Sequence, residues 1–234
     1  MQAAKVVLVP LFIGLLISTA ATHPLEFFIG VDVNHPNNVI SGDARLWAIL
    51  KSDGSYVLKH RQIQVESYQY LAPNISDEPL VKRKLSGPDA DRAIIHFTGN
   101  LSLKEGPIIF EEVAHQLVHY SFNKKLSSQT PYDFELGGNN YRISAEVAQQ
   151  QRLMRMKILL ESDAASQLLW SHEGVSDPTA RVEWVGDIDQ DGKPDLLLTM
   201  GYHYSEVTKR LYFSSPSTIG QLVKEVGQLV ISYD

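Results

Sequence analysis

Residues 132–148 decide the fold class, and they read Tyr-Asp-Phe-Glu-Leu-Gly-Gly-Asn-Asn-Tyr-Arg-Ile-Ser-Ala-Glu-Val-Ala. Apolar and polar side chains alternate on both sides of the central Gly-Gly-Asn-Asn, which is the period-two pattern of half-buried strands. Glycine and asparagine tolerate the positive φ angles of a tight hairpin turn. This stretch therefore predicts a β-hairpin that turns at residues 137–140.

The same alternation occurs at residues 61–67, where Ile63 and Val65 share one face. Further short strand candidates are residues 45–50, 93–97, 154–160, 181–185, 196–200, 210–213 and 229–233. Their spacing predicts a mainly β (β-rich α+β) fold, with antiparallel sheets in one compact domain over residues 22–234. The polar segments 72–92 and 123–131 are too short to divide that domain.

The first 21 residues have the organisation of a secretory signal peptide. A positive residue, Lys5, precedes an apolar stretch at residues 6–17, and small residues follow at 18–21. Pro10 and Gly14 interrupt the apolar stretch, which disfavours the alternative of a membrane anchor. We expect cleavage after Ala20 or Ala21, and therefore a periplasmic or secreted protein.

Composition excludes several kinds of chemistry. The 234 residues include no cysteine, so the chain has neither disulfides nor thiol nucleophiles. Because many eukaryotic secreted domains rely on disulfides, this favours a bacterial periplasm. The formal net charge of −6 argues against nucleic acid or anionic lipid as a partner. We also expect no stable membrane insertion once the signal has been removed.

Residues 186–198 carry the clearest chemical signal, Gly-Asp-Ile-Asp-Gln-Asp-Gly-Lys-Pro-Asp-Leu-Leu-Leu. Calcium takes six to eight oxygen ligands, and closely spaced carboxylates on a tight loop supply them. The candidate side-chain ligands are Asp187, Asp189, Asp191 and Asp195, and the backbone carbonyl of Lys193 is a further candidate. The sequence therefore predicts a structural calcium loop at residues 187–195.

The first six loop positions match an EF-hand, but Leu198 occupies the position at which an EF-hand has its bidentate Glu. The flanking segments are also strand candidates, whereas helices flank an EF-hand loop. The pattern Gly-Asp-x-Asp-x-Asp-Gly-x-x-Asp instead resembles a single FG-GAP or VCBS-type repeat. That resemblance implies calcium held between adjacent strands by the four aspartates. Such repeats usually form propellers, but a propeller needs at least four blades, so we do not expect one here.

Residues 111–119 are the main candidate for catalysis, because a helix there would place His115 and His119 one turn apart, as in zinc proteases. Gln116, however, occupies the position of the general base, and in a strand the two histidines would lie about 13 Å apart. We favour surface or partly buried histidines. The sequence contains no nucleophile elbow, phosphate-binding loop or dinucleotide fingerprint, and it assigns no catalytic residue.

The sequence predicts an exported calcium-binding, non-enzymatic protein that binds another macromolecule. The expected partner is another protein or a component of the cell envelope, and a periplasmic inhibitor or immunity-type protein is one specific version. One alternative is an exported hydrolase that uses a metal at His115 and His119 or a carboxylate pair. Another is a structural component of the cell envelope.

Overall fold

The computed structural model describes residues 27–29, 42–70, 80–87, 89–98, 103–120, 126–175, 178–203 and 206–232. These residues form fifteen β-strands and one short 3-10 helix, η1 (Ala90–Arg92). The strands pair in antiparallel sheets and do not close into a propeller, which confirms the predicted fold class. The predicted signal peptide, residues 1–21, lies outside the described residues.

The larger sheet contains eleven strands, in the order β1-β5-β2-β3-β6-β12-β13-β14-β15, with β4 paired to β3 and β7 paired to β6. Its strands are β1 (Phe27–Ile29), β2 (Gly42–Ser52), β3 (Ser55–Tyr70), β4 (Leu80–Ser86), β5 (Ala93–Phe97), β6 (Gly106–Tyr120), β7 (Leu126–Ser128), β12 (Thr179–Asp187), β13 (Asp195–His203), β14 (Glu206–Phe213) and β15 (Lys224–Ser232). The candidate segment 111–119 is therefore part of strand β6.

The smaller sheet has four strands in the order β11-β10-β9-β8. They are β8 (Tyr132–Leu136), β9 (Asn139–Gln150), β10 (Leu153–Ser162) and β11 (Ser166–Gly174). Strands β8 and β9 form the predicted hairpin. Its turn is shorter than predicted, because Leu136 pairs with Asn139 and only Gly137 and Gly138 lie between them. Both glycines have positive φ, as a two-residue turn between twisted strands requires.

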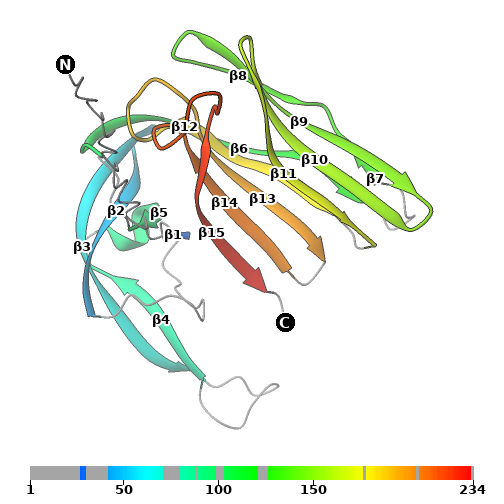
Figure 1. The fold of residues 1–234 in the computed structure, drawn as a ribbon. Coiled ribbons are helices and arrows are strands. Elements are labelled where there is room, and N and C mark those ends of the chain that lie inside the picture. The colour runs from blue at the N-terminus through cyan, green and yellow to red at the C-terminus, as the bar shows by residue number, and fades with distance from the viewer. Residues whose placement is uncertain are drawn as a thin grey trace, which may run out of the picture.

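The strands form three layers, and β12–β15 lie in the middle (Figure 1). One face of this middle layer packs on the smaller sheet through Leu196 and Leu198, together with Ile143 and Met156. The other face packs on β2, β3 and β5, where Leu197 belongs to the second core. A strand covered on both faces needs consecutive apolar residues, which explains the run of three leucines that follows the acidic loop.

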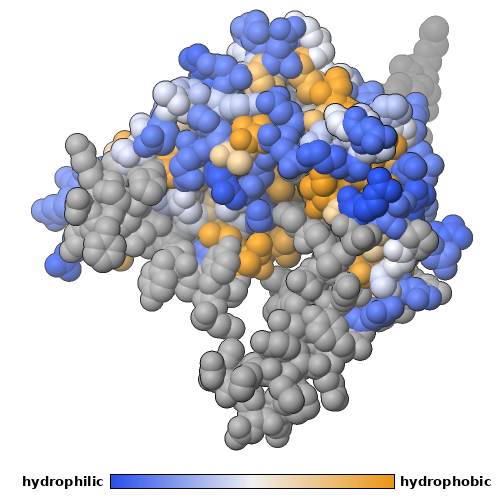
Figure 2. Space-filling view, turned by 180° about the vertical axis from the view of Figure 1, so that it is seen from behind, coloured by the Kyte–Doolittle hydropathy of each residue, from blue (hydrophilic) through white to orange (hydrophobic). Residues whose placement is uncertain are grey.

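Among the described residues, the exposed large hydrophobic side chains are Ile109, Leu168, Val175 and Ile219. On the outer face of the smaller sheet, ion pairs join Asp133 to Arg142, Glu146 to Lys157 and Glu173 to Arg155. Exposed pairs of this kind contribute little to stability, but they keep the face hydrated. On the face drawn in Figure 2, the hydrophobic residues outside the grey atoms form separate patches.

Among the described residues, no helix has the length and apolar character needed to cross a membrane.

Candidate metal centre

The acidic loop joins β12 to β13, and its two ends meet where Gly186 pairs with Asp195. Gly186 has no space for a side chain, since a methyl group there would collide with the carbonyl oxygen of Ile109 in β6. Gln190 and Gly192 both have positive φ, 61° and 79°, and the loop reverses the chain so that β13 pairs antiparallel with β12. Neighbouring strands therefore fix the base of the loop, and local backbone geometry fixes its tip.

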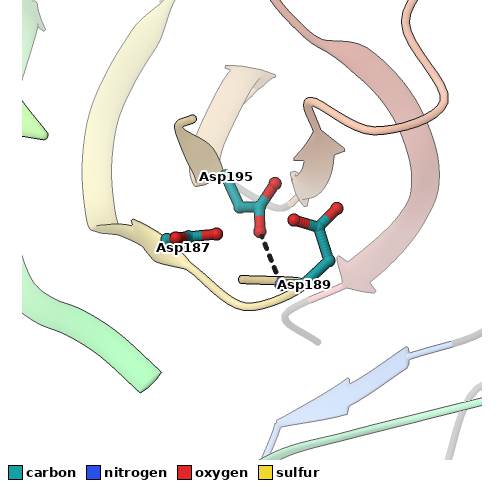
Figure 3. A group of neighbouring side chains, drawn as sticks. All are labelled: Asp187, Asp189 and Asp195. Atoms are coloured by element: carbon teal, nitrogen blue, oxygen red, sulfur yellow. Dashed lines mark hydrogen bonds between the residues drawn. The ribbon is translucent and has the colours of Figure 1, made fainter. Parts of the chain in front are cut away.

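Three of the four predicted carboxylates converge. One oxygen from each of Asp187, Asp189 and Asp195 lies within 4.8 Å of the other two. Figure 3 shows the three side chains pointing toward one another. Asp195 is fully buried and Asp187 is only 7% exposed, so two of the three charges lie away from bulk water. We refer to these three residues as the acidic triad.

Backbone amides hold two members of the acidic triad in place. The Asp187 carboxylate accepts hydrogen bonds from the amides of Asp191, at 2.9 Å, and Gly192, at 3.0 Å. The Asp195 carboxylate accepts from the amides of Ile188, at 2.7 Å, and Ser214, at 3.0 Å. These bonds preorganise both side chains, because they orient the carboxylates before any ligand arrives.

The third member, Asp189, has an oxygen without a partner. Its Oδ2 is buried and lacks a hydrogen-bond donor. Burial raises the pKa of Asp189, and the negative charges of Asp191 and Asp187 act in the same direction. Hydrogen bonds to its carboxylate from the Ser215 side chain and the Asp191 amide offset only part of this rise. Burial also raises the pKa of Asp195 well above its usual range, with a further contribution from Asp189. A cation between these groups would satisfy the orphaned oxygen and offset the repulsion, so the triad fits a hard metal ion.

The remaining predicted ligands are arranged differently. Asp191 is exposed, and both of its carboxylate oxygens lie 2.9 Å from the hydroxyl of Ser214, which donates a hydrogen bond to them. The backbone amide of Lys193 also donates to Asp191, at 2.9 Å. The structure thus engages Asp191 with Ser214 and Lys193 and leaves it outside the group formed by the other three aspartates.

Ser214 is the residue at this site that sequence reasoning missed. It follows the last residue of β14, and it contacts both Asp195, through its amide, and Asp191, through its hydroxyl. Ser214 lies 19 residues after Asp195, and nothing in the local sequence connects the two. Only the pairing of β14 with β13 brings it to the loop.

The alternative metal site at the histidines of residues 111–119 is not supported at His115. His115 lies in strand β6, and its Nε2 is 2.8 Å from the carbonyl oxygen of Thr130. Its ring packs on Tyr132, with 5.6 Å between the ring centroids. The side chain of His119 lies outside the described residues. Within the described part of the chain, the acidic triad is the group of three or more metal-ligating side chains that the fold brings together.

A carboxylate pair for hydrolysis is also unsupported at the open hollow lined by Asp133, Asn140, Tyr141, Arg142, Glu161, Ser162 and Asp163. Arg142 binds Asp133 through two hydrogen bonds, at 2.6 and 3.2 Å. These bonds lower the pKa of Asp133. A general acid for glycoside hydrolysis needs a raised pKa, so Asp133 is unsuited to that role.

The chain matches no protein-family model, and it has no significant match among curated proteins or solved structures.

Proposed function

We propose that this is an exported, non-enzymatic protein in which a calcium ion stabilises a β-rich scaffold for binding another macromolecule. The observation that supports the proposed ion is the acidic triad with the buried, unpartnered oxygen of Asp189. Oxygen ligands of this kind suit hard cations. Calcium is favoured over magnesium, because magnesium demands stricter octahedral geometry and keeps most of its waters.

The proposed role of the ion is structural. The triad joins the end of β12 to the start of β13, and the Ser214 amide ties Asp195 to the end of β14. An ion that binds only the folded chain stabilises it by RT ln(1 + [Ca²⁺]/Kd), which is about 2.7 kcal/mol at one hundred times Kd. Calcium would therefore strengthen the middle layer, on which both outer layers pack.

The proposed partner is another protein or a component of the cell envelope. The charged outer face of the smaller sheet, with Arg142, Arg155 and Lys157 beside acidic residues, offers a polar surface on a rigid sheet. Residues on rigid strands present a fixed pattern of charge, and such a pattern favours specific recognition. An inhibitor or immunity-type protein of the periplasm remains the specific version of this proposal.

Calorimetric titration of the purified protein with calcium tests the proposed binding of the ion. We expect one site in the natural chain and loss of binding in Asp189→Ala and Asp195→Asn. Lys193→Ala is the matched control. It should bind calcium like the natural chain, because the proposed contact of Lys193 is through its backbone carbonyl. Absence of binding at millimolar calcium would reject the proposal.

Affinity capture from an envelope extract tests the partner. We expect one protein or envelope component in stoichiometric amount. Reversing the charge of the smaller sheet with Arg155→Glu and Lys157→Glu should reduce its capture. Equal capture by the natural and charge-reversed chains would place the binding surface elsewhere.

A further inference from the structure

The turn of the β8–β9 hairpin rests directly on the acidic loop. A methyl group at Gly137 would collide with the carbonyl oxygen of Gly192 and would lie 3.2 Å from its carbonyl carbon. At Gly138, the other residue of the turn, an added methyl group meets no atom within 4 Å. Because both glycines have positive φ, 60° and 75°, they differ mainly in this contact. The smaller sheet therefore touches the loop at one residue of its turn.

The same loop contacts two further segments of the chain. Gln190 Nε2 donates a hydrogen bond to the carbonyl oxygen of Lys104, at 3.1 Å, just before β6. Ser214, at the end of β14, bonds to Asp191 and Asp195. With Gly137, three segments far apart in the sequence meet at the loop. A change in the conformation of the acidic loop would therefore alter its contacts with these segments as well as the connection of β12 to β13.

A short chain of contacts links the hairpin to the acidic triad. The carbonyl group that faces Gly137 is that of Gly192, and the amide of the same residue donates to Asp187 Oδ2 at 3.0 Å. On either side of the turn, Leu136 and Tyr141 are buried in the core between the two sheets.

We propose that the acidic loop and the β8–β9 turn form a latch that couples occupancy of the triad to docking of the smaller sheet. This inference rests on the proposed calcium site, in which Asp189 Oδ2 is buried without a hydrogen-bond donor. An ion bound to Asp187 also restrains Gly192 through this hydrogen bond, and with it the carbonyl group on which Gly137 rests. Without the ion, the amide bonds still orient Asp187, but repulsion among the three carboxylates opposes them, and the hairpin end of the smaller sheet opens more often.

Coupling of this kind is reciprocal, so a change in the hairpin must alter the affinity of the ion site by the same factor. Gly137→Ala removes no ligand, yet it forces the turn away from Gly192. We expect this variant to bind calcium at least about five-fold more weakly, the low end of ordinary coupling between sites. Gly138→Ala is the matched control. It introduces similar backbone strain without the collision and should bind like the natural chain.

Hydrogen exchange of the natural chain, followed by mass spectrometry with calcium and with a chelator, gives a second test. We expect peptides from residues 132–148 to exchange at least about five-fold faster in the chelator. Peptides from the β2–β3 hairpin, residues 46–63, should change little. If calorimetry shows calcium binding, but hydrogen exchange of residues 132–148 is equal with calcium and with the chelator and the two glycine variants bind calcium equally well, the latch is rejected. The calcium site itself would still stand. Absence of calcium binding would overturn both.

Discussion

At the residue scale, the acidic loop combines two satisfied carboxylates with one that is not. Asp187 and Asp195 each accept two or more hydrogen bonds from backbone amides. Asp189 accepts one through Oδ1, from the Asp191 amide, and keeps a buried Oδ2 without a donor. A buried unsatisfied polar group costs about 1–3 kcal/mol. A solvated acidic turn gains nothing from this arrangement. A metal site would benefit from it, because Asp189 Oδ2 is free to bind a metal ion.

Asp189→Asn is expected to change stability in opposite directions with and without calcium. In a chelator, the variant should melt at a higher temperature, because it removes a buried negative charge beside Asp187 and Asp191. In calcium it should melt lower, since it loses up to about 2.7 kcal/mol of ion stabilisation at one hundred times Kd. Thermal unfolding in both conditions measures this. Asp53→Asn, in the β2–β3 turn, is the control and should show no such crossing.

His96 provides a prediction on pH. It is fully buried in β5, with its Nε2 at 3.3 Å from the Ala90 carbonyl oxygen and its Nδ1 unpartnered. Burial lowers the pKa of His96 below its usual value of 6.5. The unfolded chain therefore binds the proton more readily. The resulting stability is present above pH 6.5 and is lost as the pH falls toward the folded-state pKa.

We expect His96→Gln to flatten the loss of stability between pH 7.5 and 5.5. The two proteins should differ in the slope of unfolding free energy against pH by at most about 1.4 kcal/mol per pH unit, which is the value for one bound proton. Urea unfolding of both chains in a chelator measures it. Parallel curves for the two proteins would show that His96 does not titrate with folding.

At the element scale, a bulge in β6 sets the register of the middle layer. Val182 of β12 pairs with His115, but Trp184 pairs with Glu112, so β6 has an extra residue in this interval. Ala114 lies there with φ of 52°, a left-handed conformation that disfavours any side chain. The bulge changes which residues of β6 face each layer, and simple alternation in the sequence cannot reveal it.

Ala114→Gly should therefore stabilise the protein by about 1 kcal/mol, because glycine adopts the left-handed conformation without steric cost. Ala148→Gly is the matched control in β9, a strand of ordinary backbone, where the change should destabilise by about 0.5–1 kcal/mol. Urea unfolding of the two variants measures both effects. A loss of stability in both would mean that the bulge is not strained.

At the scale of the whole molecule, the smaller sheet is held at more than one place. Besides the core and the Gly137 contact, Gln167 of β11 reaches the segment before β15. Its Nε2 donates to the Val223 carbonyl oxygen at 2.7 Å, and its Oε1 accepts from the amides of Leu222 and Val223 at 2.6 and 3.0 Å. One part-buried side chain thus satisfies three backbone groups across the layer boundary.

Gln167→Ala should cost about 1–3 kcal/mol, since it leaves buried backbone groups without partners. The effect should not depend on calcium, because this contact lies outside the chain of bonds that starts at the triad. Chemical unfolding with and without calcium checks both statements, with the exposed Gln150→Ala as control. A loss that appears only in the chelator would extend the proposed latch to β11.

Local sequence determined the fold class and the position of the loop. Strand alternation and turn residues act over a few neighbours, so the β8–β9 hairpin and the strands on both sides of residues 187–195 were predictable. Strand β11 was not, because its alternation is broken where Leu169 and Trp170 both pack toward the core beside a register shift. Segment 111–119 could not be resolved into helix or strand until its partners were known.

The tertiary structure alone decided which groups meet at the loop. The spacing of the aspartates can be read directly from the sequence, so the four candidate ligands could be named without the structure. Convergence of three of them depends on the pairing of β12 with β13, which closes the loop. Engagement of Asp191 by Ser214 and contact of Gly192 with Gly137 depend on segments farther away in the chain. Such contacts arise from packing, which no local pattern encodes.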